Sequence, residues 1–426
     1  MKNIVIVHLE SLSNGILKLN QDLFPNIIQW KKKMEEYTNY YSTATSTLMV
    51  MTDLFFEDTS LFEDSTYLHS LAKTKKSKKS LFDRLHEDGY HTHLLYYGLS
   101  ENLRQVRENL QEILAEAGNA WYGDTDKELQ NKLLEIIGSQ EPFALFIEEN
   151  ASHISYTGER ISKEKHSGYH IFRERYSILD KTVGLLFEIL QQKDILENTL
   201  VLLYGDHGEE FWFHGLHEGY THAIEPFTDM VNCPLLIYDG KNENKVNDSL
   251  VDTTDIGSII KNKVGLNTKP VKKDYVISRN LFAKQIRLEK VFNKSYSITD
   301  GRYTLLLSKK GLALYINEMD MYNLCNILDF FVLQGEELVF RKECKKLISS
   351  HIKYFMTEEQ QRETTEEFYM LREWLKNYIN QLPDLQGKYS FRRINYTRGN
   401  TRWALRMRIF FDRLIMIIGD ELRKRR

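Results

Sequence analysis

Acids and an imidazole stand directly after two of the apolar runs in this sequence. Glu10 follows the run at residues 4–9, and Asp206 and His207 follow the run at residues 200–204. Such runs are typical of buried strands in a parallel sheet, whose carboxyl ends border the crevice where ligands bind. The spacing therefore predicts one shared metal site. A solvent-facing loop acid, or an Asp-His pair that caps a helix, is the alternative at each position.

A third apolar run is also followed by polar side chains. Residues 143–147 precede Glu148, Glu149, Asn150 and His153. The carboxyl ends of parallel strands meet at one edge of a sheet, so these groups are expected near the first three.

Five aliphatic hydroxyls crowd residues 42–47, just before the apolar run at residues 48–51. Hydroxyls in this position ordinarily cap a helix, and at least one is expected to do so. The alternative is a nucleophile that is ionised by a bound cation, while the helix N-terminus holds an anion. Carboxylates, a Thr alkoxide and an imidazole suit a divalent metal, and the imidazole favours Mn or Zn over Ca.

Strand and helix patterns alternate along the 426-residue chain, which indicates an α/β fold with a mostly parallel central sheet flanked by helices. The strand candidates are residues 4–9, 93–97, 143–147, 200–204 and 235–238. The helix candidates are residues 26–36, 80–88, 99–116, 127–137 and 172–192.

A small antiparallel sheet is expected near the C-terminal end, because apolar runs at residues 303–307 and 312–314 flank a Lys-Lys-Gly turn. We predict a catalytic domain over residues 1–335 that includes this sheet from about residue 270. Residues 336–426 are expected to be a helical region that ends in a basic tail.

Several segments resemble the alkaline phosphatase superfamily, in the sulfatase-like branch that includes lipoteichoic acid synthases and phosphoethanolamine transferases. They include Val-Ile-Val-His-Leu-Glu-Ser at residues 5–11, Cys-Pro-Leu-Leu-Ile at residues 233–237, and residues 24–42, 80–90, 152–156 and 198–209. The likeness spans about 320 residues in family order. It implies that superfamily's fold and one or two divalent metal ions.

The resemblance also assigns roles to particular residues. The family's metal acid falls on Glu10, and its strand-end pair falls on Asp206 and His207. Its nucleophile, which is also a metal ligand, falls on Thr43, because the spacing from there to residues 52–55 matches the family's nucleophile helix.

Thr45 is the alternative nucleophile if the turn is one step longer. The histidine of the family's His-x-x-Tyr segment falls on His153, where contact with the substrate phosphate or a second metal is implied. A further substrate-binding histidine falls on His217, with His214 and His222 as alternatives. The histidines expected to be structural are His8, His91 and His93.

Two departures from the family favour phosphate over sulfate chemistry. Formylglycine-dependent sulfatases need Cys or Ser followed by x-Pro-x-Arg, whereas Thr43 is followed by Ala-Thr-Ser-Thr. Ser11 follows Glu10, where calcium sulfatases have a second aspartate. We predict a phosphotransferase or phosphodiesterase that moves a group such as phosphoglycerol or phosphoethanolamine to a glycan or lipid-linked glycan. The alternatives are a sulfatase or phosphomonoesterase, and a non-catalytic, membrane-recruited binding protein.

Charge is distributed unevenly along the chain. The chain has a formal net charge of −3, yet residues 386–426 carry a net of about +9, which leaves about −12 on the rest. Residues 403–418 are amphipathic and too interrupted by arginine to span a membrane, so we predict that they lie on an anionic membrane surface. The alternative is a helix packed on the acidic body or in a homo-oligomer interface. Nucleic acid is not expected as a partner.

The three widely spaced cysteines form no CxxC pair, which fits a reducing compartment. The N-terminal apolar run is too short for a signal peptide, and no apolar window is long enough for a membrane span. We therefore expect a cytoplasmic protein, peripheral at the inner face of the cell membrane.

Overall fold

The structure is a computed structural model. It describes residues 1–60, 78–115, 118–139, 142–153, 168–211, 214, 219–241, 243–266, 272–281, 294–341, 347–348, 353–354, 356–382, 385 and 387–395. The amphipathic tail segment and His217 lie outside the described residues. The chain divides into two compact units. The first comprises residues 1–43, 47–207 and 232–273, and the second residues 44–46, 208–231 and 274–426.

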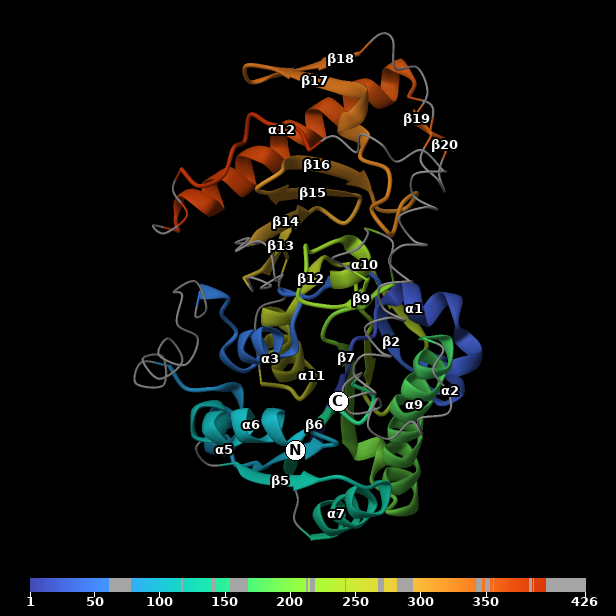
Figure 1. Cartoon of the computed structure of the whole chain (residues 1–426). Helices are drawn as coiled ribbons and strands as arrows, with labels where there is room; N and C mark the ends of the chain where they lie inside the picture. Colours follow the sequence, from blue (N-terminus) through green and yellow to red (C-terminus); the bar gives the residue numbers. More distant parts are fainter. Residues whose placement is uncertain are drawn as a thin grey trace, which may run out of the picture. The chain divides into compact units, whose positions relative to one another are not determined.

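An eight-stranded sheet forms the centre of the first unit (Figure 1), in the order β11-β2-β10-β7-β1-β6-β4-β5. Five strands are parallel: β1 (Asn3–Leu9), β4 (His91–Tyr97), β5 (Asn119–Gly123), β6 (Phe143–Glu149) and β7 (Thr199–Gly205). Three more extend the sheet beyond β7: β10 (Leu235–Tyr238), which is antiparallel to β7, then β2 (Glu35–Tyr37) and β11 (Lys245–Asn247).

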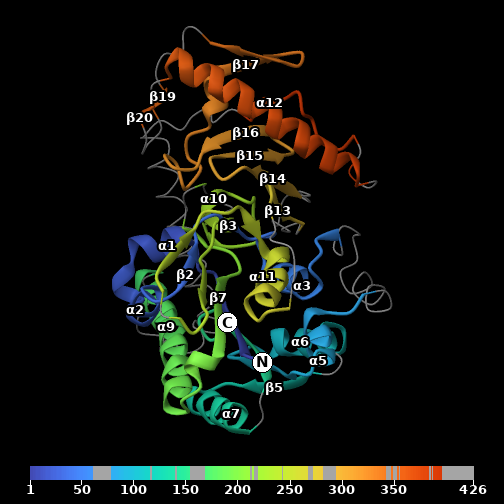
Figure 2. The same ribbon diagram turned by 180° about the vertical axis from the view of Figure 1, so that it is seen from behind.

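Helices cover both faces of this sheet. On one side lie α2 (Pro25–Lys31), α7 (Asp126–Ser139) and α9 (Gly168–Gln192), and on the other α3 (Thr47–Phe56), α5 (Leu81–Glu87), α6 (Glu101–Leu114) and α11 (Ile256–Lys263), as Figures 1 and 2 show. Every residue of β1, β6 and β7 is buried, as expected for parallel strands covered on both faces. The predicted α/β class is confirmed.

Shorter elements complete the first unit. They are α1 (Asn14–Leu19), η1 (Gln21–Leu23), β3 (Tyr40–Tyr41), η3 (Leu196–Asn198), β12 (Val251–Asp252) and η4 (Thr253–Asp255). The helix predicted over residues 26–36 is too long, because the structure ends it at Lys31 and uses Glu35–Tyr37 as strand β2. Pairing with β2 satisfies the backbone groups that β10 would otherwise leave unpaired along its far side.

The second unit contains the predicted antiparallel sheet. Its four strands lie in chain order: β13 (Val276–Asn280), β14 (Ser295–Thr299), β15 (Tyr303–Ser308) and β16 (Gly311–Ile316). The remaining elements are β8 (Glu210–Phe211), β9 (Gly219–Thr221), α10 (Thr228–Val231), η5 (Ile327–Phe330), β17 (Phe331–Gln334), β18 (Glu337–Phe340), β19 (Leu347–Ile348), β20 (Lys353–Tyr354) and α12 (Glu358–Asn380).

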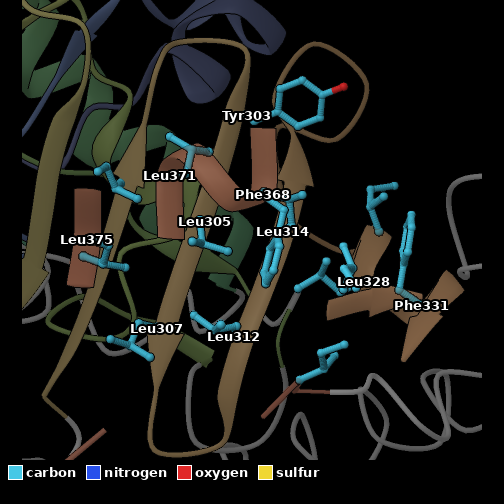
Figure 3. Close-up of a cluster of buried hydrophobic side chains, with 14 of the residues drawn as sticks. Tyr303, Leu305, Leu307, Leu312, Leu314, Leu328, Phe331, Phe368, Leu371 and Leu375 are labelled. Atoms are coloured by element: carbon cyan, nitrogen blue, oxygen red, sulfur yellow. The ribbon is translucent and has the colours of Figure 1, made fainter. Parts of the chain in front are cut away.

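Helix α12 packs on this sheet through one apolar stripe. Phe368, Leu371, Leu375 and Ile379 are buried and recur at helical spacing, and Thr357 caps the helix N-terminus. Figure 3 shows Leu371 and Leu375 gathered with side chains of β15 and β16 in one cluster. The sheet and the region after residue 335 therefore share one core. None of the described helices is long and apolar enough to cross a membrane.

Candidate metal and nucleophile site

The carboxyl ends of β1 and β7 bring Glu10 and Asp206 together. The two strands pair in parallel with Leu9 opposite Gly205, so the next residue of each strand reaches the same point. Gly205 is required for this approach, because a Cβ there would lie 2.2 Å from the carbonyl oxygen of Leu12. Glu10, Asp206 and His207 are each 0% exposed. The structure thus brings the three predicted metal ligands to one buried location.

Ser11 holds one oxygen of each carboxylate. Its backbone N–H donates to Oδ1 of Asp206 at 2.9 Å, and its hydroxyl donates to Oε1 of Glu10 at 2.8 Å. The His207 N–H also donates to Asp206 Oδ1, at 2.8 Å. The other Asp206 oxygen, Oδ2, is buried and has no hydrogen-bond partner among the described residues. Each carboxylate is therefore fixed through one oxygen, and its second oxygen can bind a cation.

Five donor atoms form a closed ring around this point. Asp206 Oδ2 lies 3.0 Å from His8 Nε2 and 3.1 Å from His207 Nε2. The Thr47 hydroxyl is 3.2 Å from His207 Nε2 and 3.3 Å from Glu10 Oε2, and Glu10 Oε2 is 3.7 Å from His8 Nε2. We call these residues the five-donor ring. It contains two carboxylates, two imidazoles and one hydroxyl.

The five-donor ring fits a divalent cation. Neighbouring donors around the ring lie 3.0–3.7 Å apart, and the ligand atoms of His8, Glu10 and Asp206 all lie within 4.8 Å of one another. His8 Nε2 and Asp206 Oδ2 are 3.0 Å apart, yet neither has a hydrogen-bond partner among the residues that the structure describes. Two donor atoms at this separation are placed as two ligands of one cation would be. His8, Glu10 and Asp206 together could hold a metal ion.

The electrostatics of the ring also suit a cation. Burial lowers the pKa of His8, but the negative charges of Asp206, Glu10 and Glu148 outweigh it and raise this pKa to about 9. Burial and mutual repulsion oppose ionisation of Glu10 and Asp206. Even so, the neighbouring histidines hold the pKa of both carboxyl groups below its ordinary value. The site therefore holds anionic carboxylates in a dry environment, where positive charge is stabilising.

Thr47 enters the ring as the first residue of α3. A neighbouring threonine, Thr43, makes a different contact: its hydroxyl donates to Oδ2 of buried Asp53 at 2.5 Å. The Thr45 hydroxyl donates to the carbonyl oxygen of Ile224 at 3.0 Å. The Thr47 hydroxyl contacts Glu10 and His207.

The described histidines among the predicted substrate ligands have different neighbours. Nε2 of His153, whose side chain is partly exposed, lies 4.0 Å from Oε1 of Glu10. His214 and His222 belong to the second unit, where His214 stacks on Phe227 and Nδ1 of His222 lies 3.5 Å from Oε1 of Glu209. The predicted contacts of His217 lie outside the described residues.

Two members of the ring were not predicted as site residues, although the sequence holds a signal for each. His8 and Glu10 are two positions apart, which places both side chains on one face of an extended segment. Thr47 is the last hydroxyl before the apolar run, where the N-terminus of a helix is available to an anion. Alternation along the strand and the helix start would have identified both.

A buried ion pair lies beside the ring. Glu148 is opposite His8 in the register of β6 and β1, and it accepts two hydrogen bonds from Arg107 of α6, at 2.8 and 2.6 Å. Asn150 donates to the same carboxylate. Arg107 is 2% exposed and Glu148 is 0% exposed, so the pair is excluded from solvent. It fixes the strand residue next to His8.

Glu149 faces a different environment. It accepts hydrogen bonds from the backbone N–H of Ser152 at 3.0 Å and from the Ser152 hydroxyl at 2.5 Å. Burial is the main reason that its pKa is raised to about 7, and the charge of Glu10 adds to the effect. These bonds fold the turn that carries His153.

The model of the sulfatase family matches residues 2–260. No curated protein matches the chain.

Solved structures share the fold at low sequence identity. A protein in the alkaline phosphatase superfamily from Vibrio parahaemolyticus is 17% identical, with a TM-score of 0.55 over 74% of this chain and 78% of that one. BT1596, a 2-O GAG sulfatase, is 13% identical, with a TM-score of 0.63 over 90% and 93%. The lipoteichoic acid synthase LtaP from Listeria monocytogenes is 14% identical, with a TM-score of 0.54 over 76% and 88%.

Proposed function

Because the chain belongs to the sulfatase family, and is thus an enzyme of the alkaline phosphatase superfamily, we propose that it transfers or hydrolyses phosphate esters with Thr47 as its nucleophile. The resemblance predicted from the sequence is confirmed at the level of the superfamily. Thr47 takes the role that the sequence assigned to Thr43.

One observation carries this proposal. The Thr47 hydroxyl lies between Glu10 Oε2 and His207 Nε2, at 3.3 and 3.2 Å, at the N-terminus of a ten-residue helix. The Thr43 hydroxyl instead donates to Asp53. Both hydroxyls donate to a carboxylate, but the Thr47 hydroxyl lies between two candidate metal ligands, where a bound cation could stabilise its anion.

The chemistry would proceed in two displacements at phosphorus. A divalent ion, for which Mn or Zn is expected, would when bound lower the pKa of the Thr47 hydroxyl. In the first step the Thr47 hydroxyl loses its proton as its oxygen bonds to phosphorus, the ester bond opposite breaks, and the leaving oxygen departs with its electron pair and takes up a proton. In the second step an acceptor hydroxyl or water loses its proton as it attacks the phosphothreonine, and the Thr47 oxygen leaves with its electron pair and is protonated again.

Other residues of the chain would hold the phosphate group during these steps. The backbone N–H groups of the first turn of α3 lie beside Thr47, and a helix N-terminus stabilises phosphate oxygens. His153 is partly exposed and 4.0 Å from Glu10, a position from which it could protonate the leaving oxygen. Ser11 keeps both carboxylates in place.

The substrate class follows from the family resemblance. One solved structure with a similar fold is that of a lipoteichoic acid synthase, and another is that of a 2-O GAG sulfatase. We expect a phosphodiester-type donor that carries phosphoglycerol or phosphoethanolamine, with a glycan or lipid-linked glycan as acceptor.

Hydrolysis of a sulfate ester is the second candidate. The family model and most of the solved structures with this fold that are named as enzymes support it. Formylglycine, however, is made from Cys or Ser, and the hydroxyl in the ring belongs to a threonine. Thr47 itself can still attack phosphorus directly, which favours phosphate chemistry.

The test is turnover of chromogenic phosphodiester, phosphomonoester and sulfate esters by the purified chain with Mn²⁺ or Zn²⁺. We expect the phosphodiester to turn over fastest. Activity should be lost with a chelator and in Asp206→Asn. Asp88→Asn makes the same chemical change at an exposed residue and should behave as wild type. Faster turnover of the sulfate ester would overturn the proposal in favour of the second candidate.

A further inference from the structure

We infer that His8 is itself a metal ligand, which gives the site two imidazoles and makes zinc its preferred ion. This inference rests on the proposed function, because it concerns the same cation. It adds His8, near the carboxyl end of buried strand β1, a histidine that was expected from the sequence to be structural.

The position of the His8 ring carries the first step. Nε2 lies 3.0 Å from Asp206 Oδ2 and 3.7 Å from Glu10 Oε2, and the side chain is 1% exposed. Glu148 is its neighbour across β6, and the ring of Tyr204 is 5.7 Å away on β7. Those neighbours enclose the imidazole, so Nε2 reaches the carboxylates without room for bulk water between them.

The contact between His8 and Asp206 is close but poorly aligned for a hydrogen bond. A structural histidine that anchored Asp206 would donate to Oδ2 with good geometry, since buried polar atoms almost always pair. Nδ1 of His8 has no hydrogen-bond partner in the described part of the chain, and the 3.0 Å contact between His8 Nε2 and Asp206 Oδ2 lacks the alignment of a well-formed hydrogen bond. A cation bound by both atoms satisfies them together.

The donor set then indicates the metal. His8 and His207 supply two nitrogens, while Glu10, Asp206 and Thr47 supply oxygens. Calcium and magnesium prefer sites made only of oxygen, and manganese also favours oxygen donors, whereas imidazoles favour zinc. The buried ring offers a compact mixed set that suits zinc best.

The experiment measures metal binding by the full-length chain without substrate. Competition with a chromogenic chelator gives the Kd for Zn²⁺, Mn²⁺ and Mg²⁺, and X-ray absorption of the zinc form counts imidazole ligands. We expect tightest binding for Zn²⁺. His8→Gln should weaken Zn²⁺ binding by more than about 100-fold and remove one imidazole from the count. His91→Gln, an exposed change at the start of β4, should alter neither.

A protein with His153→Gln tests the same point without altering the strand, in case His8→Gln fails to fold. The zinc ion bound to this variant should still have two imidazole ligands, from His8 and His207. A count of one imidazole would overturn the inference. An unchanged imidazole count in His8→Gln, with or without weaker binding, would also overturn it but leave the proposed function intact. Zinc that binds equally well to Asp206→Asn would contradict both.

Discussion

The backbone N–H of Ser11 donates a hydrogen bond to Oδ1 of Asp206 at 2.9 Å, joining residues that are 195 positions apart. Ser11 has a φ of 52°, in the left-handed region that L-residues with a Cβ rarely adopt. This conformation lets one residue reach Asp206 with its N–H and Glu10 with its hydroxyl. The hydrogen bonds that Ser11 donates to the two carboxylates offset the cost of this conformation.

Two substitutions of Ser11 should separate the strain from the hydrogen bond. Ser11→Ala and Ser11→Gly both lose the bond to Glu10, so each should weaken zinc binding by about tenfold. Only glycine accommodates the positive φ without strain. Ser11→Gly should therefore have a free energy of unfolding about 1 kcal/mol higher than Ser11→Ala. Urea denaturation with a chelator measures this difference, and equal stabilities would contradict a left-handed Ser11.

The choice between Thr47 and Thr43 predicts opposite phenotypes. Thr47→Val removes the hydroxyl in the five-donor ring and should lower kcat/KM by at least about 1,000-fold with little change in stability. Thr43→Val removes the hydroxyl that donates to buried Asp53, so it should cost about 1–3 kcal/mol of stability while kcat/KM is retained. Rates on a phosphodiester and urea unfolding give both quantities. Loss of activity in Thr43→Val alone would restore Thr43 as the nucleophile.

The sequence predicted the sheet because its signals are local. Each parallel strand is an apolar run that both faces bury, and Glu10 and Asp206 stand directly after two of them. The end of the helix at Lys31 was not predictable in this way, since strand β2 forms only to pair with β10, about 200 residues later.

In the site, too, local features could be predicted from the sequence, whereas long-range contacts could not. Spacing selected Thr43, with Thr45 as the alternative, and could not point to Thr47, because the contacts of Thr43 with Asp53 and of Thr47 with Glu10 form only in the folded chain. The proposed role of His8 as a metal ligand also depends on a long-range contact, because β7 brings Asp206 next to its Nε2 only in the folded chain.

The ion pair between Arg107 and Glu148 should matter far more than an exposed pair on the same helix. Arg107→Met leaves Glu148 buried without its cation, which should cost about 3–5 kcal/mol. The control is Arg104→Met, which breaks the solvent-exposed pair with Glu108 and should cost less than about 1 kcal/mol. Urea unfolding measures both. Similar losses in the two variants would show that the Arg107 pair is solvated.

The metal-free protein should lose stability as the pH rises from about 5 to 7, because of Glu149. Burial raises the pKa of this carboxyl from 4.5 to about 7 in the folded state. The folded state therefore holds a proton that the unfolded chain has released. Its contribution is complete below pH 4.5 and is lost as the pH rises through 7, by up to about 3 kcal/mol.

Glu149→Gln should flatten this pH dependence, since an amide keeps an acceptor for the Ser152 N–H without a titrating group. Urea unfolding of both proteins at several pH values, with a chelator present, measures the two slopes. Above pH 7 the free energy of unfolding of both proteins should continue to fall, because His8, whose pKa is raised to about 9, loses its proton there. The difference between them is therefore expected below pH 7, and equal slopes there would mean that Glu149 ionises freely in the folded state.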